Sequence, residues 1–193
     1  MSSGLDDFVD DHNENDDNKV ILSSIEIKGK KDRFELNRRQ CKLSDILITA
    51  LDYDDNKGKT TEIPLHVDGP TLKLIVEYLV HHNGSAPTII VGSMRYRTMK
   101  EVCDDPWDLT FVNDIVTSPD GKMQLYKLAS GANYMCINSL MNLACARFAC
   151  ILKGVPLNRF KETLRSDLIK GRTYESDMTD SKREIEKFAA WVR

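Results

Sequence analysis

The sequence LYKLASGANYMCINSLMNLACARFACILKG, residues 125–154, decides the fold. Its first part repeats leucine and alanine at the three- and four-residue spacing of a helix with one apolar face, and the same spacing returns in its second part. The two periodic stretches meet at residues 133–137. We therefore predict two amphipathic helices joined by a hinge, each burying one face. The predicted face residues are Leu125, Leu128, Ala129 and Ala132 in the first helix, and Ile137, Leu140, Ala144, Phe148 and Ile151 in the second.

Composition is that of an ordinary globular protein. The chain has 193 residues, 41% of them hydrophobic and 30% charged, which suffices for one core with a small appended domain. No apolar run approaches the ~20 residues that cross a bilayer, and the N-terminus lacks the basic and apolar regions of a signal peptide. We therefore expect no membrane association and a location in the cytoplasm and the nucleus.

Charge is unevenly distributed along the chain. Seven acidic residues and no lysine or arginine occupy the first seventeen positions, whereas the net charge of the whole chain is -3. Such a segment has too few apolar side chains to offset the entropy of ordering, so we predict that residues 1–19 are disordered. The remaining chain is mildly basic but has no basic stripe with interleaved aromatic residues. We therefore expect no nucleic acid as a partner.

Residues 20–67 predict a small sheet. Apolar residues at 20–27 and 33–36 flank the turn-forming residues 28–32, a pattern that indicates a β-hairpin. A further short strand is predicted at 63–67. It contains Pro64, which has no N–H to donate to a sheet ladder, so this strand should lie at an edge.

Two helices are predicted within the same part of the chain. Ser44 can cap a short helix over 44–51, because its side chain can accept a hydrogen bond from a free N–H of the first turn. Pro70 suits the first turn of a longer helix that ends at 81–84. The two adjacent histidines at that end are interpreted as surface residues, since neighbouring helix positions point about 100° apart and cannot share one metal ion.

The second half of the chain begins with an irregular segment. Residues 83–105 lack periodicity and contain several glycine and proline residues, so we predict a long, mobile surface loop. Residues 106–111 end this loop, and 118–121 form a turn before the two helices described first. Helical periodicity is weaker beyond residue 154, where we predict a helical extension over 154–193.

Motifs of catalysis and of metal or cofactor binding are missing from the sequence. It contains no G-x-S-x-G, H-E-x-x-H or G-x-x-x-x-G-K-[ST], and no G-x-G-x-x-G after a strand. A partial calcium-loop pattern begins at Asp52, but Lys57 replaces the glycine of its turn and Ile63 replaces its closing glutamate. The five cysteines form no C-x-x-C pair and are expected to be buried, reduced thiols. We therefore assign no catalytic residue, no metal ligand and no cofactor.

Four short strings follow one another along the chain in a particular order. They are IPL at 63–65 running into YLVHH at 78–82, WD at 107–108 with Phe111, GANYM at 131–135, and ILKG at 151–154. Their order and spacing resemble the S-phase-kinase-associated adaptor family of SCF ubiquitin ligases, which is related to elongin C. The resemblance implies an α/β fold: a BTB/POZ domain with a small mixed sheet and a helical body over 20–153, followed by a C-terminal helical F-box-binding extension over 154–193.

The same resemblance implies an adaptor that bridges the N-terminal domain of a cullin to the F-box proteins that select substrates, without catalysis. It places Asn133 and Tyr134 in the cullin interface. From the pattern alone, Tyr134 can also be a core residue with its hydroxyl at the rim, and Trp191 can pack on its own core. The residues implied in the F-box interface are Leu143, Arg147, Ile151, Phe160, Leu164 and Trp191.

Some residues depart from the family pattern. The loop that is acidic in the family is partly basic here, through Arg95, Arg97 and Lys100. The proline that follows the ILKG string is shifted by one position to Pro156, so the F-box contacts there and its hydroxylation or glycosylation are left open. An elongin-C-like adaptor would end near Lys153, whereas forty residues follow here. A BTB-type oligomeric scaffold and a weak homodimer also remain as alternatives.

Overall fold

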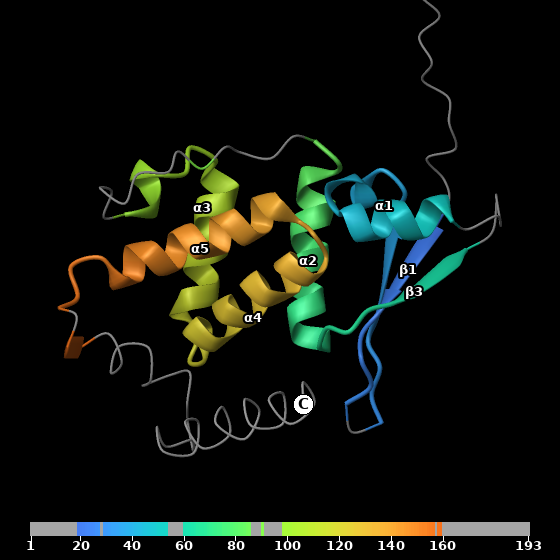
Figure 1. Ribbon diagram of the computed structural model, residues 1–193, viewed down its shortest axis with the longest axis horizontal. Helices are drawn as coiled ribbons and strands as arrows, with labels where there is room; N and C mark the ends of the chain where they lie inside the picture. The colour runs from blue at the N-terminus through green and yellow to red at the C-terminus, as the bar shows by residue number, and fades with distance from the viewer. Residues whose placement is uncertain are drawn as a thin grey trace, which may run out of the picture. The chain divides into compact units, whose positions relative to one another are not determined.

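The computed structural model describes residues 19–27, 29–53, 60–85, 90, 98–156 and 158–159 (Figure 1). Over these ranges the chain forms five α-helices, two 3-10 helices and three strands. This confirms the α/β class, with the small mixed sheet and helical body of a BTB/POZ-like domain. The chain divides into two compact units: a sheet unit, Met1–Pro87 with Ser130–Met141, and a helical unit, Thr88–Ala129 with Asn142–Arg193.

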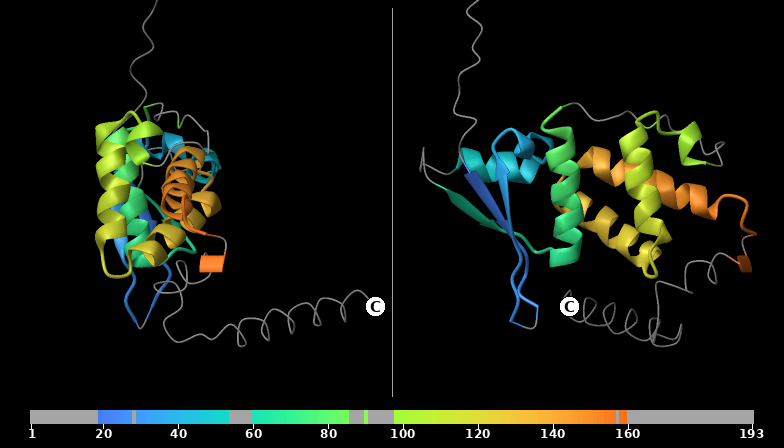
Figure 2. Two further views of the ribbon diagram at one scale, coloured as in Figure 1. Left: turned by 90° about the vertical axis from the view of Figure 1, so that its left-hand side faces the viewer. Right: turned by 180° about the vertical axis from the view of Figure 1, so that it is seen from behind.

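The sheet unit contains a three-stranded mixed sheet. Its strands β1 (Lys19–Ser23), β2 (Arg33–Asn37) and β3 (Thr61–Pro64) lie in the order β2-β1-β3. β1 pairs antiparallel with β2 and parallel with β3. The β1–β2 hairpin, drawn in blue in Figure 2, confirms the sequence prediction. β3 is an edge strand of this sheet, as predicted from Pro64, although it ends at that residue instead of continuing to 67.

Three helices complete the first part of the sheet unit: η1 (Gln40–Leu43), α1 (Asp45–Asp52) and α2 (Gly69–His82). The Ser44 side chain caps α1 by accepting from the N–H of Leu47 at 3.3 Å, which confirms the predicted cap. α2 begins after Asp68, and a left-handed residue ends it. Both helices were therefore correctly located from local sequence signals.

The end of α2 corrects one prediction. His82 is only 8% exposed, and its ring lies 4.2 Å from the ring of Tyr78, one helical turn earlier. His81 is exposed, as predicted, and so is Val80. The buried face of α2 is thus rotated toward Tyr78 and His82, because an aromatic pair four residues apart can bury more area there than valine.

The helical unit contains η2 (Met99–Glu101), α3 (Pro106–Thr117) and most of α4 (Gly121–Tyr134) and α5 (Asn138–Leu152). The two helices α4 and α5 confirm the prediction from 125–154. The helix α3 was not predicted, because its first residues were interpreted as the end of a loop. Its start is nevertheless well capped: the Asp105 carboxylate accepts from the N–H groups of Trp107 and Asp108 at 2.8 and 3.1 Å.

Part of the predicted loop 83–105 is folded. Residues 98–105 contain η2, whose capping box joins Thr98 and Glu101, and residues 99, 102 and 103 are buried. The prediction of a mobile surface loop is therefore wrong for residues 98–105. Residues 86–89 and 91–97 lie outside the described residues, as do the acidic segment 1–18 and the extension from 160 onward.

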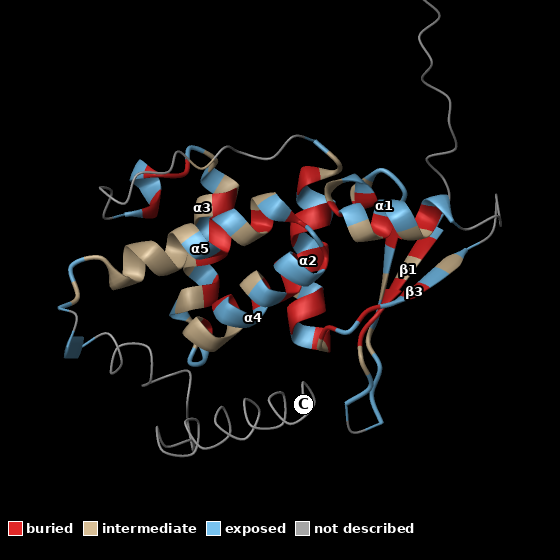
Figure 3. Cartoon of the chain, in the orientation of Figure 1, coloured by how far each residue is buried: buried red, intermediate tan, exposed pale blue. Residues whose placement is uncertain are grey.

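Burial in Figure 3 shows which predicted faces are covered. β1, α2 and the segment between α4 and α5 carry fully buried residues. All five cysteines are free thiols, of which Cys41 and Cys103 are buried and Cys150 is half-buried. The expectation of buried thiols is wrong for Cys136 and Cys145, which are exposed beside the covered positions. Among the described residues, no helix is long and apolar enough to cross a membrane.

Candidate protein-binding surfaces

The segment between α4 and α5 mixes buried and exposed residues within one short turn of chain. We call the exposed group, together with the nearby exposed residue His66, the hinge surface. The buried group holds this surface on the sheet unit, so its exposed side chains start from a fixed backbone. The exposed residues are Asn133, Tyr134 and Cys136; the buried residues are Gly131, Ala132, Met135 and Ile137.

The hinge backbone forms a complete helix end. The N–H of Cys136 donates to the carbonyl of Asn133 at 3.1 Å. The N–H of Ile137 donates to the carbonyl of Ala132 at 2.8 Å. This pair of bonds is the Schellman motif, in which the residue after the helix adopts a left-handed conformation. Cys136 does so with φ of 53°, although glycine is the usual residue there.

Ser44 joins the hinge to α1. Its hydroxyl donates to the carbonyl of Met135 at 2.6 Å and also accepts from the N–H of Leu47 at 3.3 Å. Ser44 is fully buried, so both bonds satisfy groups that water cannot reach. The hinge is therefore bonded to α1, which lies 91 residues earlier in the chain.

Gly131 allows the end of α4 to approach α2 closely. A Cβ atom at Gly131 would lie 2.9 Å from Cδ1 of Ile75 and 3.2 Å from Cγ2 of Thr71. Both distances are shorter than ordinary contacts between carbon atoms, which are about 3.5–4.0 Å. The glycine of the GANYM string thus has a packing role in the sheet unit.

Tyr134 is held beside the loop that follows β3. Its side chain is 43% exposed, and its hydroxyl accepts a long hydrogen bond, 3.5 Å, from the N–H of His66. A tyrosine with part of its ring in solvent supplies apolar area together with a polar group, a combination that is frequent at protein interfaces. The hinge surface therefore combines exposed apolar area with a polar group.

A second surface lies on the C-terminal part of α5, in the helical unit. We call residues 146–153 the α5 terminal face; all of them are half-buried. Leu143 and Ala144 are the last buried residues of the helix. The apolar spacing predicted to reach Phe148 and Ile151 is present in the sequence. These two residues, however, are only half-buried. Unlike the start of α5, this face is incompletely covered.

Two positively charged groups of the α5 terminal face have no hydrogen-bond partner among the described residues. They are Nε of Arg147 and Nζ of Lys153, and both atoms are buried. Burial lowers the pKa of Arg147. Burial also raises the pKa of the Cys150 thiol, and the charges of Arg147 and Lys153 oppose this change. The charges of both cations thus act on one thiol of this face.

The predicted site residues fall into four groups. Asn133 and Tyr134 lie together on the hinge surface, and Arg147 and Ile151 lie on the α5 terminal face. Leu143 is 1% exposed and packs within the core, so a partner cannot reach it in this structure. Phe160, Leu164 and Trp191 lie outside the described residues. The roles assigned to all these residues remain predictions.

Other residues of these surfaces were missed. The sequence indicated Ser44 only as a helix cap, because no local pattern shows its bond to Met135. The contact of His66 with Tyr134 likewise depends on the fold. Lys153 lay within a quoted string but had no assigned role. Within the described ranges, no group of three or more His, Cys, Asp or Glu side chains could hold a metal ion.

No family model matches the chain. The curated proteins that it resembles include an S-phase kinase-associated protein 1 homolog from Tetrahymena thermophila, which is 28% identical over 146 residues, or 75% of this chain and 80% of the relative. The E3 ubiquitin ligase complex SCF subunit sconC of Arthroderma benhamiae is 28% identical over 149 residues, covering 76% and 82%. SKP1-like protein 9 of Arabidopsis thaliana is 25% identical over 148 residues, covering 75% and 81%.

Proposed function

Since the chain is a divergent member of the S-phase kinase-associated protein 1 family, we propose that it is an adaptor subunit of an SCF-type cullin-RING ubiquitin ligase. In this role it bridges the N-terminal domain of a cullin to the F-box proteins that select substrates. The names of two relatives support a role in this complex. One is described as an S-phase kinase-associated protein 1 homolog and the other as a subunit of an SCF ubiquitin ligase. The chain acts by contact and catalyses no reaction.

The hinge surface is the proposed cullin contact. The observation that carries this assignment is the exposure of Asn133 and Tyr134 on a backbone held by buried residues and by Ser44. A partner that docks there meets side chains on a backbone that is already held, so little backbone entropy is lost on binding. An exposed tyrosine is also among the residue types that contribute most to interfaces.

The α5 terminal face, together with the extension over 154–193, is the proposed F-box contact. Arg147 and Ile151 belong to it, and its half-buried side chains support the idea that a partner completes it. In this proposal the domain proper ends near residue 153. We propose that the adaptor is found in both the cytoplasm and the nucleus.

Reconstitution tests the adaptor function directly. The purified chain is mixed with a cullin N-terminal domain and with an F-box fragment, and the complexes are separated by size-exclusion chromatography. We expect two binary complexes and one ternary complex with all three components. If the chain binds neither partner at micromolar concentration, the adaptor function is wrong.

The same experiment separates the alternatives. An oligomeric BTB scaffold would show the mass of a dimer or larger assembly in light scattering without any partner. An elongin-C-like adaptor would bind a cullin but no F-box fragment. The SCF adaptor binds both, and its free form has the mass of a monomer.

A further inference from the structure

A group of exposed cations lies at η1, in the sheet unit. We call Arg38, Arg39 and Lys42 the η1 basic surface; all three are exposed. The N–H of Lys42 donates to the carbonyl of Arg39 at 3.1 Å, so these two residues are three positions apart in a 3-10 turn. Side chains at this spacing lie on the same side of a 3-10 helix. Two positive charges are therefore held next to each other in solvent.

Only one cation of this surface has an acidic partner among the described residues. Nη2 of Arg38 lies 2.8 Å from Oδ1 of Asp52. Arg39 and Lys42 form no ion pair with any other residue that the structure describes. The next acid along the chain, Asp45, is exposed in the first turn of α1, where the helix dipole favours a negative charge. Arg39 and Lys42 thus remain available to a further acidic group.

We propose that the acidic N-terminal segment of this chain, residues 6–17, docks on the η1 basic surface. The segment contains seven acidic residues and no lysine or arginine, so its charge is opposite to that of the surface. An electrostatic contact requires no regular structure, which agrees with the predicted disorder of residues 1–19. This inference does not depend on the proposed function.

The start of β1 brings the segment to this surface. Lys19 is the first residue of β1 and lies opposite Asn37, the last residue of β2. Residues paired in this way have Cα atoms about 4.5–5.5 Å apart. Since Arg38 directly follows Asn37, the segment joins the sheet unit beside the first cation of the surface.

The turn from β2 into η1 is held by reciprocal hydrogen bonds. The N–H of Asn37 donates to Oε1 of Gln40 at 2.9 Å, and the N–H of Gln40 donates to Oδ1 of Asn37 at 2.8 Å. Cys41, within η1, is fully buried and anchors this helix in the core. The backbone that carries the cations is therefore fixed relative to Lys19.

Covalent attachment makes even a weak contact effective. Asp16 and Asp17 lie within three residues of Lys19, so they can extend at most about 10 Å from it. A group attached through so short a length of chain has an effective concentration in the millimolar range. A separate acidic protein would need a similar concentration to compete. Attachment thus favours the chain's own segment as the occupant.

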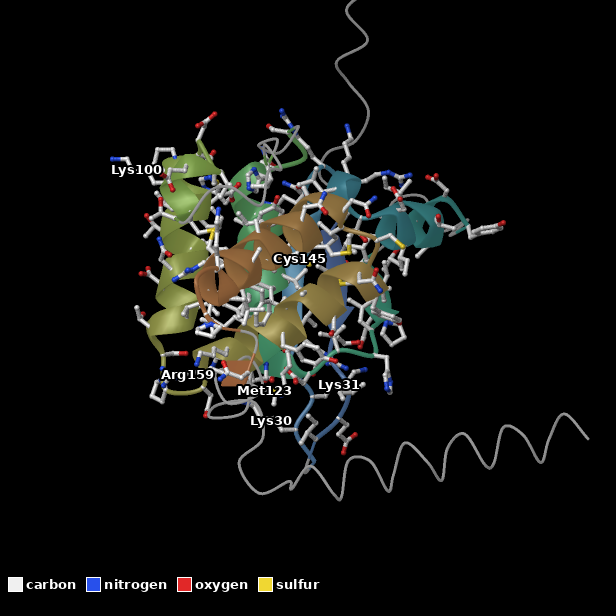
Figure 4. All side chains as sticks on the ribbon, turned by 60° about the vertical axis from the view of Figure 1, so that its left-hand side comes forward. Lys30, Lys31, Lys100, Met123, Cys145 and Arg159 are labelled. Atoms are coloured by element: carbon white, nitrogen blue, oxygen red, sulfur yellow. The ribbon has the colours of Figure 1, made fainter. Side chains whose placement is uncertain are left out.

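The tip of the β1–β2 hairpin also carries cations, but those of the described residues are paired. Nζ of Lys30 lies 3.2 Å from Oδ1 of Asp32. Nζ of Lys31 and Nε of Arg33 lie 2.9 and 3.5 Å from Oε1 of Glu62. Lys30 and Lys31, labelled in Figure 4, therefore gain less from another acidic group than Arg39 and Lys42 do.

The test uses the full chain and a carbodiimide, which links a carboxylate to an amine in direct contact with it. Mass spectrometry identifies the links, and a mixture of chains with light and heavy nitrogen separates links within one chain from links between chains. We expect links from residues 6–17 to Lys42 within one chain. Their yield should fall at least about threefold at about 1 M salt, where the Debye length is ~3 Å. Links to Lys19 measure what attachment alone produces, and should change less.

Two variants locate the contact. Arg39→Gln removes one cation but keeps the Cγ atom that lies beside Gly84. It should lower the yield of links to Lys42 at least about twofold, because the surface loses part of its positive charge. Lys73→Gln removes an exposed cation near the start of α2 and should leave this yield unchanged.

Acetylation of lysines gives a second measurement. If the seven acidic residues of the segment are replaced by their amides, Lys42 should be acetylated at least about twofold faster, because the docked segment no longer covers it. The rate at Lys73 should stay the same. This comparison requires no change within the described residues.

Other outcomes overturn the inference. Links to Lys42 that persist at high salt, in a constant ratio to those at Lys19, would come from attachment alone. Links mainly to Lys30 and Lys31 would place the segment on the hairpin tip. Links to Lys42 only between chains would mean that a second copy supplies the acidic segment, and an absence of links to Lys42 would mean that no acidic group docks there.

Discussion

The hinge surface and the α5 terminal face differ in how completely they are built. At the hinge, buried residues alternate with exposed ones, the helix end has its full set of backbone bonds, and Ser44 holds the carbonyl of Met135. On the α5 terminal face no residue is fully buried, and two buried cationic atoms have no described partner. One surface is thus complete before a partner arrives, whereas the other is not.

This difference has thermodynamic consequences. A complete surface loses little entropy on binding, so changes to its exposed side chains should alter affinity without altering the stability of the free chain. An incomplete surface gains bonds on binding, so its affinity should depend on charge and salt. Substitutions at the hinge surface test the first half of this comparison.

Replacement of Tyr134 by aspartate should have the largest effect. It removes the aromatic ring of the hinge surface and places a charge in the proposed interface. We expect cullin binding to weaken by about 3 kcal/mol or more, roughly a hundredfold, as for a central interface tyrosine. Surface plasmon resonance with the cullin N-terminal domain measures the change, and F-box binding should be unaffected.

Tyr126 provides the matched control. It lies on the same helix α4 and is 55% exposed, but belongs to the helical unit. Tyr126→Asp should therefore leave cullin binding unchanged. Equal losses for both tyrosine variants would mean that the charge acts through the helix rather than through the hinge surface.

Replacement of Gly131 by valine should destabilise the sheet unit. The new side chain would overlap Ile75 and Thr71, whose nearest atoms would already lie 2.9 and 3.2 Å from a Cβ atom. Overpacking of this kind typically lowers the free energy of unfolding by about 1–3 kcal/mol. Urea denaturation followed by circular dichroism measures it.

Gly131→Ala distinguishes overlap from a general intolerance of side chains. The nearest atom, Cδ1 of Ile75, is the end of a flexible side chain and can move. Alanine also gains up to about 1 kcal/mol of helix propensity over glycine. The alanine variant should therefore be close to the natural chain in stability. If alanine lowered the free energy of unfolding as much as valine does, the close approach of the backbone at position 131, and not the size of the side chain, would exclude residues other than glycine.

Replacement of Ser44 by alanine should have a smaller effect on stability. It removes two buried hydrogen bonds and leaves the carbonyl of Met135 and the N–H of Leu47 without that partner. We expect a loss of about 1–2 kcal/mol in the free energy of unfolding. Because the bond fixes the hinge, cullin affinity should fall as well.

Thr49→Ala is the control for Ser44. The Thr49 hydroxyl donates to the carbonyl of Asp45 at 2.7 Å within the same helix, but this bond is exposed. Its removal should change stability by less than about 0.5 kcal/mol. If Ser44→Ala were equally mild, the hinge would not depend on its bond to α1.

These contacts show what the sequence could and could not predict. The hairpin, α2 and the two helices around the hinge follow from periodicity and caps, which are local signals. The bond from Ser44 to Met135 joins distant segments, so no local pattern contains it. α3 was missed because residues 106–111 were interpreted as the end of the preceding loop, although Asp105 caps the helix and Pro106 begins it.

The two surfaces also differ in how far the sequence could predict them. The exposed pair Asn133 and Tyr134 was predicted, since the family resemblance marks it by identity. On α5 the apolar spacing is the same at Ala144 and at Ile151, but only Ala144 is buried. Periodicity shows which side of a helix is apolar and says nothing about whether another segment covers it. The resemblance named Arg147 and Ile151 on this face, but its incomplete burial could be found only from the fold.

Thiol labelling compares the two surfaces without altering either. Cys136 lies on the hinge surface and is exposed, whereas Cys150 lies on the α5 terminal face, where burial raises its pKa. Alkylating reagents react with the thiolate, so we expect Cys136 to react faster than Cys150 at neutral pH. Cys41, buried with its pKa raised to about 12, should react only when the chain unfolds. Mass spectrometry of timed samples gives the three rates.

Partners should then protect different cysteines. The cullin domain should slow labelling of Cys136, because this residue follows Tyr134 by two positions on the proposed interface. The F-box fragment should slow labelling of Cys150, which lies on the α5 terminal face. Cys145, exposed on α5 (Figure 4), serves as the internal reference. If the cullin domain protected Cys150 and left Cys136 reactive, the two surfaces would have to exchange partners, and the complete surface would be the one that receives the F-box.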